Sequence, residues 1–356
     1  KKEVKAWEDR LSLFRLNRLI YHYPSANPRM QEWGNTIIKM GEELDLVFLL
    51  EKASIINEKI SRNRLLKNEN HNVESELKKW RTVSEGVRNL SVELYRMRFD
   101  YSEENMSEKH FELRKAFIND YLKINEKDRK THFLSLLNDA FHLRKKGQMT
   151  LQEIYPLFKF GLSTELILQN NQITRASYTS IVSTGNILKD FDFSEYVIKQ
   201  YSENLKKEIR EDARQWGFAH TYSKKGKFEK CLDVLLSHEF KSTDFQILTR
   251  MLTLQTYFEL FLKSPDSYES YLFSYCNSFE RWLNREYKKS GVVRASTIRF
   301  IQKCRKLAKI YLDVNFHESK IDRMFLNEES LQGVEWLREK LRQIRLIKTG
   351  RRAVKI

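Results

Sequence analysis

The amino-acid sequence predicts an all-α protein built from stacked antiparallel helix pairs. Apolar residues recur at intervals of three and four along most of the chain, which is the period of a helix with one buried face. The breaks between these periodic stretches are short and polar. The 356 residues include only 4 Pro and 11 Gly, whereas sheets joined by many tight turns need more of both.

The size of the chain favours an extended arrangement. At 356 residues it exceeds the usual size of one compact core, so we expect either two domains or an elongated array. The low proline and glycine content favours the array. We expect an N-terminal helical region at 1–106, helical repeats at 107–315, and a capping or docking helix with a basic tail at 316–356.

The helical period predicts seven helices in the N-terminal half. The first ends where Pro24 and Pro28 forbid continuation, and the polar run 67–73 follows the third. The fourth carries a near-heptad apolar stripe that we expect to be core: Leu77, Trp80, Val83, Val87, Leu90, Leu94 and Met97. The predicted ranges are 4–23, 29–43, 44–66, 74–99, 107–124, 128–146 and 151–170.

Eight further helices are predicted in the C-terminal half. Their ranges are 175–189, 193–207, 212–225, 227–240, 243–263, 268–289, 295–313 and 329–347. The last of them is amphipathic, so we expect it either to bind a partner chain or to cap the array. Its apolar side consists of Val334, Leu337, Leu341, Ile344 and Ile347.

One segment, 212–240, contains a recognisable motif: DARQWGFAHTYSKKGKFEKCLDVLLSHEF. A small residue is followed three positions later by Tyr, then by Gly, an aromatic residue and a second small residue: Ala219, Tyr222, Gly226, Phe228 and Cys231. This series resembles the tetratricopeptide repeat, a helical hairpin of about 34 residues. Cys231 stands where that family usually has Ala.

Each motif position has a physical role in such a hairpin. Ala219 and Cys231 are small enough for two antiparallel helices to approach closely, while Tyr222 and Phe228 fill the remaining space. Gly226 is expected to end the first helix in the left-handed conformation. A single hairpin leaves apolar surface on both sides, so it needs neighbours.

Weaker versions of the motif extend the resemblance to about 128–284. Upstream, Ala140 and Gly147 have the separation of Ala219 and Gly226, and Phe193 precedes Phe228 by one repeat length. Gly185 is a candidate for a close helix approach. The resemblance implies a right-handed superhelix of stacked pairs that resembles tetratricopeptide repeats.

The resemblance also implies a function. Proteins of this family bind peptide segments along the first helix of each pair, so we expect a non-enzymatic scaffold for protein–protein interaction. In the clearest repeat, the residues beside the packing positions are Trp216, His220 and Lys224, and we predict that they line the partner-binding groove. The other interpretation is that Trp216 packs against the adjacent repeat.

The charge distribution suggests an alternative function. The net charge is +16, and the excess is concentrated near the C-terminal end. We predict a basic patch formed by Arg294, Arg299, Lys303 and Lys306. Such a face suits the phosphates of a nucleic acid or an acidic protein, although basic helical faces are often simply solvated.

Other classes of function lack a signature. The sequence contains no CxxC or HExxH pair, so we expect no metal and no cofactor. Each of the three cysteines reads as a small core residue. No apolar run is long enough to span a bilayer, so we expect no membrane insertion and a cytoplasmic location. An enzyme whose site converges only in space stays an alternative.

Overall fold

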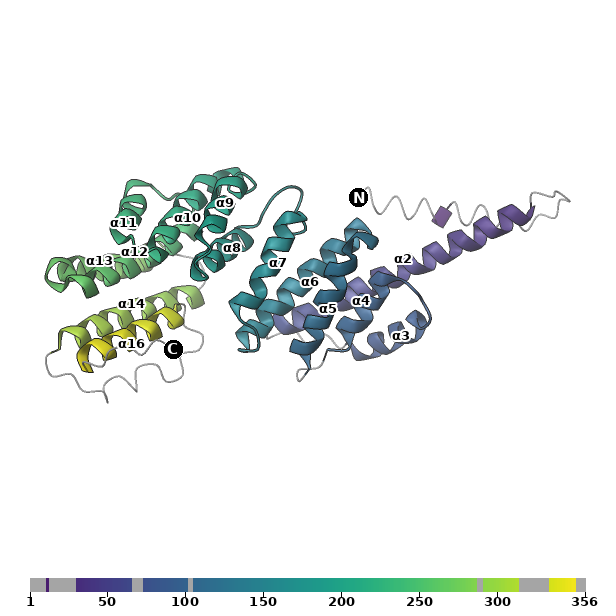
Figure 1. Ribbon diagram of the computed structural model, residues 1–356, viewed down its shortest axis with the longest axis horizontal. Coiled ribbons are helices and arrows are strands. Elements are labelled where there is room, and N and C mark those ends of the chain that lie inside the picture. The colour runs from purple at the N-terminus through teal and green to yellow at the C-terminus, as the bar shows by residue number, and fades with distance from the viewer. Residues whose placement is uncertain are drawn as a thin grey trace. The chain divides into compact units, whose positions relative to one another are not determined.

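The computed structural model describes residues 11–12, 30–65, 73–101, 105–286, 291–313 and 333–349 (Figure 1). Within these ranges it has fourteen α-helices and two short 3-10 helices, packed mostly against their neighbours in sequence. The all-α prediction is confirmed. The chain divides into two compact units, 1–168 and 169–356. The predicted divisions after 106 and after 315 stay predictions.

Unit 1 is organised around one long helix, α2. This helix packs against α3, α4 and α6 and supplies four buried residues to a core shared with α3 and α4: Leu49, Leu50, Ala53 and Ile56. The described elements of the unit are α2 Met30–Leu65, α3 Glu74–Ser84, α4 Leu90–Phe99, α5 Met106–Asp120, η1 Tyr121–Lys123, α6 Glu126–Lys145 and α7 Leu151–Ser163.

The long helix α2 corrects one prediction. The expected helices 29–43 and 44–66 are continuous, because nothing at their junction breaks the backbone hydrogen bonding and the isolated Gly41 costs only about 1 kcal/mol. The predicted helix 4–23 lies outside the described residues except for 11–12, which are helical. Of the predicted loop 67–73, only Val73 is described.

A second correction concerns the predicted helix 74–99, which is two helices. Gly86 has a φ of +78°, a conformation that ends a helix and that glycine adopts without strain. Asn89 then starts α4, since its side chain accepts hydrogen bonds from the amides of Ser91 and Val92. The apolar stripe therefore bends, and Val83 is 69% exposed instead of core.

Unit 2 begins with three successive helical hairpins, α8–α9, α10–α11 and α12–α13, and continues with α14 and α16. Helix α10 packs against α8, α9, α11 and α12, so it contacts its own partner and the first helices of both neighbouring hairpins. The elements are α8 Arg175–Ile187, α9 Phe191–Tyr201, η2 Lys207–Ile209, α10 Arg210–Lys224, α11 Phe228–Ser237, α12 Thr243–Lys263, α13 Pro265–Arg285, α14 Gly291–Leu312 and α16 Val334–Thr349. Leu337 and Ile344 of α16 are buried in the core with α12, α13 and α14.

The turn between α10 and α11 has the predicted geometry. Gly226 has a φ of +72°, the left-handed conformation expected from the motif. The amide of Lys227 donates to the carbonyl of Tyr222 at 2.9 Å, and that of Gly226 donates to Ser223 at 3.0 Å. This pair of hydrogen bonds is the Schellman arrangement at a helix end. The turn closes the hairpin tightly.

The preceding hairpin, α8–α9, closes in the same way without glycine. Lys189 has a φ of +63°, and the amide of Asp190 donates to the carbonyl of Gly185 at 2.9 Å. By this equivalence Phe191, and not the predicted Phe193, corresponds to Phe228, since both residues begin the second helix. Ser194 then corresponds to Cys231, and both are fully buried.

The two turns yield a matched prediction. We expect Gly226→Ala to lower the free energy of unfolding by about 1 kcal/mol, because a Cβ is disfavoured at positive φ although it would meet no atom within 4 Å. We expect Lys189→Gly to leave stability unchanged or raise it by up to about 1 kcal/mol. Urea titration followed by circular dichroism measures both. If Gly226→Ala and Lys189→Gly lowered the free energy of unfolding by similar amounts, the two turns would not be equivalent.

Candidate functional site

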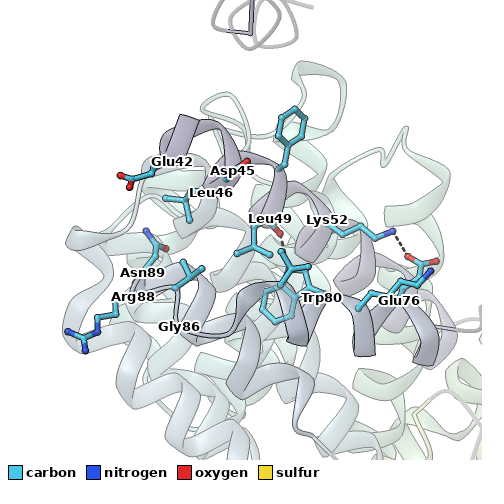
Figure 2. A pocket seen from close by; sticks show the side chains of 14 residues that line it. Glu42, Asp45, Leu46, Leu49, Lys52, Glu76, Trp80, Gly86, Arg88 and Asn89 are labelled. Atoms are coloured by element: carbon cyan, nitrogen blue, oxygen red, sulfur yellow. Dashed lines mark hydrogen bonds and ion pairs between the residues drawn. The ribbon is translucent and has the colours of Figure 1, made fainter. Parts of the chain in front are cut away.

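Unit 1 has a surface groove between α2, α3 and the α3–α4 turn (Figure 2). It has a volume of about 1170 Å³. Leu46, Leu49, Trp80 and Val87 form an apolar floor, of which Leu49 and Trp80 are buried. This set is called the α2–α3 groove below. Because its floor comes from two helices, its width depends on how α3 is held against α2.

Trp80 holds the two helices together. Its indole N–H donates to the backbone carbonyl of Leu49 at 2.9 Å, and the side chain is 2% exposed. Its ring also packs edge-on against Phe99 at 5.0 Å and Tyr95 at 6.5 Å between ring centroids. The indole therefore has both a satisfied donor and aromatic neighbours, so it is a rigid part of the floor.

At one end of the groove, ion pairs connect α2 and α3. Glu76 on α3 accepts hydrogen bonds from the ammonium groups of Lys52 at 2.7 Å and Lys59 at 2.5 Å, both on α2. The hydrogen bonds from Lys52 and then Lys59 lower the pKa of Glu76 to about 2. Glu76 is thus ionised throughout the physiological range, and the link between α2 and α3 persists.

The opposite end is closed by the α3–α4 turn. The Arg96 guanidinium donates to the carbonyl of Ser84 and, at 3.2 Å, to that of Val87. These bonds fix the backbone around Gly86 and so place Arg88 and Asn89 at the rim. The groove is therefore bounded at both ends by side chains that are already paired within unit 1.

Apart from the paired Lys52 and Glu76, the charged residues on the two long walls of the groove have opposite signs. Glu42 and Asp45 line the α2 wall, whereas Lys79 and Arg88 line the wall formed by α3 and the turn, and all four are exposed. Phe48 and Val83 also line the groove, and they are 47% and 69% exposed. An apolar floor with an acidic and a basic wall suits an amphipathic helix with charged flanks.

The sequence did not predict this groove, because it lies where one straight helix was expected. The available signal was the run Ser84–Asn89, in which a glycine is followed at a short distance by a residue that prefers the N-cap position. Reading that run as a turn would have placed Trp80 and Val87 on two elements.

The predicted groove residues of α10 lie on one face of the helix, but they differ in solvent exposure. Trp216 is 4% exposed; its ring stacks on His220 at 5.3 Å and packs against Phe245 of α12 at 6.1 Å. It therefore serves packing between hairpins, as the alternative interpretation expected. His220 is half-buried and Lys224 is exposed. A partner role for His220 and Lys224 stays a prediction.

The His220 ring takes part in a polar contact inside unit 2. Its Nδ1 accepts a hydrogen bond from the Asn186 amide at 3.0 Å, and the same amide donates to Thr221 at 3.0 Å. Desolvation of the ring, followed by the nearby Lys224 ammonium, lowers the pKa of His220 to about 3. The ring is therefore neutral at physiological pH.

The predicted packing residues occupy the interior of the hairpin. Ala219 and Cys231 are completely buried, Phe228 is buried and Tyr222 is half-buried. The close helix approach expected at Gly185 stays a prediction, whereas Gly217 of α10 provides such an approach. A Cβ on Gly217 would lie 2.8 Å from Ile198 and 3.2 Å from the Tyr178 hydroxyl, so its absence lets α10 approach α8 and α9.

The predicted basic patch lies on α14. Arg294, Arg299 and Lys306 are exposed and Lys303 is half-buried. The helical period places Arg299, Lys303 and Lys306 on one flank of the helix, whereas Arg294 falls on another. The structure therefore brings three of the four residues together.

The three buried cysteine thiols are held in their neutral form. Burial raises the pKa of Cys231 to about 11 and that of Cys276 to about 12, and it raises the pKa of the Cys304 thiol as well. These thiols are protonated at physiological pH, which does not suit a nucleophile. The described residues contain no group of three or more His, Cys, Asp or Glu that could hold a metal ion.

His238 contacts a buried carboxylate. Its Nε2 lies 2.9 Å from Asp212 on α10, and the same carboxylate accepts from the amides of Lys241 and Ser242. Asp212 thereby links the start of α10 to the α11–α12 connection.

In the part of the chain that the structure describes, no helix combines the length and apolarity needed to cross a bilayer.

Comparison of the chain with protein-family models, curated proteins and solved structures gives no match in any of the three. The resemblance to the tetratricopeptide repeat therefore rests on the hairpin at 212–240 and its neighbours, and the comparisons assign the chain to no family.

Proposed function

We propose that this protein is a non-enzymatic scaffold that binds an amphipathic helical segment of another protein in the α2–α3 groove. The observation that carries the proposal is an apolar groove that exposes Phe48 and Val83 between two oppositely charged walls. A docked helix would bury Phe48 and Val83, and burying apolar surface contributes about 25 cal/mol per Å² before the costs of association.

The wall charges specify the flanks of the partner helix. A helix lying along the groove presents one flank to Glu42 and Asp45 and the other to Lys79 and Arg88. A partner with basic residues on one flank of its apolar stripe and acidic residues on the other is therefore complementary. Two acidic or two basic flanks would bring like charges together at one wall.

We further propose that α8–α9, α10–α11 and α12–α13 are successive units of a right-handed superhelix that resembles tetratricopeptide repeats. The shared turn geometry of the first two hairpins and the packing of α10 against α8 and α12 support this arrangement. In it, His220 and Lys224 would belong to a second partner surface.

The groove can be tested with designed helical peptides. We expect a labelled peptide with a leucine stripe and mixed flanks to bind more tightly than peptides of equal length with all-acidic or all-basic flanks, as measured by fluorescence anisotropy. We expect Val83→Glu to weaken binding of the mixed peptide by about tenfold or more, since a carboxylate would be desolvated beside the apolar stripe.

A matched control separates the groove from surface hydrophobicity in general. Leu122, in η1 of the same unit, is 67% exposed and does not line the groove. We expect Leu122→Glu to bind the mixed peptide like the unchanged protein. Equal loss in both variants, or no preference for mixed flanks, would refute the proposed site.

A further inference from the structure

Unit 2 has a strip of positive charge along two adjacent helices, α14 and α16. Three of its members lie on α14, where Arg299 and Lys306 are exposed and Lys303 is half-buried. Helix α14 contains no Asp or Glu along its whole length, Gly291–Leu312. The positive charge on this flank is therefore not offset from within its own helix.

Helix α16 runs beside α14 in the same direction. Near the start of α16, the Trp336 ring lies 5.8 Å from that of Phe300. Near its end, the Lys348 ammonium donates to the carbonyl of Asp313 at 3.1 Å and lies over the ring of Tyr311. Contacts at both ends keep the helices side by side, so cations in the middle of each lie at similar levels.

The contacts of α16 also define its sides. Lys340 pairs with Glu259 of α12 at 2.6 Å, and the Trp336 indole donates to the same carboxylate. Lys340 therefore marks the side that faces α12, and Trp336 lies between α12 and α14. The helical period places Arg338, Arg342 and Arg345 on the flank next to Lys348, whose ammonium contacts α14. Arg338 and Arg342 are exposed and Arg345 is half-buried, and Glu335 and Glu339 lie one turn before the first two.

The sides of α14 are defined in the same way. Phe300 and Tyr311 face α16, whereas Arg305 pairs with Glu280 of α13 at 3.0 Å and marks the opposite flank. Lys303 is one turn from Phe300, on the flank nearest α16. The basic strip therefore consists of Arg299, Lys303, Lys306, Arg338, Arg342 and Arg345, lying on both sides of the line where the two helices meet.

The chemistry of the strip favours one class of ligand. Protein interfaces depend on buried apolar and aromatic anchors, and none of the six members supplies one. Binding to a nucleic-acid backbone requires only cations placed along a line of phosphates. The eight residues from Arg299 to Lys306 span roughly 10 Å along the helix axis, which matches about three charges of a strand that carries one charge per roughly 3.4 Å.

We propose that the basic strip of α14 and α16 binds the phosphate backbone of a nucleic acid, without reading base sequence. This inference is independent of the α2–α3 groove, because the strip lies wholly in unit 2. Cations that contact phosphates release condensed counterions, so binding must weaken steeply as salt concentration rises.

The test uses the full chain and a labelled single-stranded RNA of mixed sequence, with affinity measured by anisotropy across a salt series. We expect Arg299→Glu combined with Arg338→Glu to reduce affinity by about tenfold or more and to make the salt slope shallower by roughly 1.4, since each contact contributes about 0.7 for a single strand.

The control removes the same charge elsewhere. Lys115 on α5 and Lys230 on α11 are exposed and lie outside the strip, so Lys115→Glu combined with Lys230→Glu should leave affinity within about twofold of the unchanged protein. An equal loss of affinity in both double variants would show that net charge alone causes the effect, and it would overturn the proposal. A flat salt response, or efficient competition by polyglutamate, would also overturn it, the latter in favour of an acidic protein ligand.

Discussion

Replacing Asp139 by alanine is expected to lower the free energy of unfolding of unit 1 by about 3–5 kcal/mol. Asp139 on α6 is paired with Arg98 on α4, and the two side chains are 3% and 1% exposed. Arg98 also reaches the Ser61 hydroxyl of α2 at 3.4 Å, so one guanidinium joins three helices. Without the carboxylate, a buried cation loses its counter-charge. Urea titration monitored by circular dichroism measures the loss.

Two further variants distinguish burial from ion pairing. Asp100 pairs with Arg81 at 2.9 Å, but both side chains are more than half exposed, so Asp100→Ala should cost less than about 1 kcal/mol. The double replacement Arg98→Met and Asp139→Leu removes both charges and should recover most of the stability lost in Asp139→Ala. If Asp139→Ala and Asp100→Ala cost the same, the buried pair does not have the predicted role.

Helix boundaries could be predicted best where the backbone has a specific local signal. The predicted range 243–263 matches the helix that the structure places at Thr243–Lys263. Pro265 lies two residues beyond the end of this helix and cannot continue it. Gly226 likewise predicted its own left-handed turn. The Lys189 turn was missed, since nothing in the side chain of lysine indicates positive φ; the neighbouring helices impose that conformation.

The candidate groove could not be predicted because it depends on the relative placement of helices. Trp80 was correctly assigned to the core by its position in an apolar stripe. Nothing local indicated that its indole would bond to the carbonyl of Leu49, far back in the sequence. Val83 was misassigned for the same reason, because the helix bends after it and leaves no element to cover it. Trp216 shows the converse, since a residue predicted for binding is covered by Phe245.

Acidification is expected to destabilise unit 1 through His132. This side chain on α6 is 4% exposed, with Tyr95 at 4.4 Å and Phe117 at 6.4 Å between ring centroids. Burial, followed by the nearby Arg98 charge, lowers the pKa of His132 to about 3 from an ordinary 6.5. In the unfolded chain His132 therefore binds a proton below about pH 6.5, whereas in the folded chain it binds one only below about pH 3.

The sign of the effect follows from this difference in bound protons. The stability that comes from keeping His132 neutral is fully present above about pH 6.5 and is lost progressively toward pH 3. At pH 5 the free energy of unfolding has already fallen by roughly 2 kcal/mol. His132→Phe should remove that share of the pH dependence, because phenylalanine cannot be protonated. Hydrogen exchange of the α6 amides at neutral and mildly acidic pH measures the local stability. The matched variant His142→Gln alters a half-buried residue of the same helix and should keep the full acid sensitivity; if His132→Phe keeps it too, the buried ring is not the group that responds.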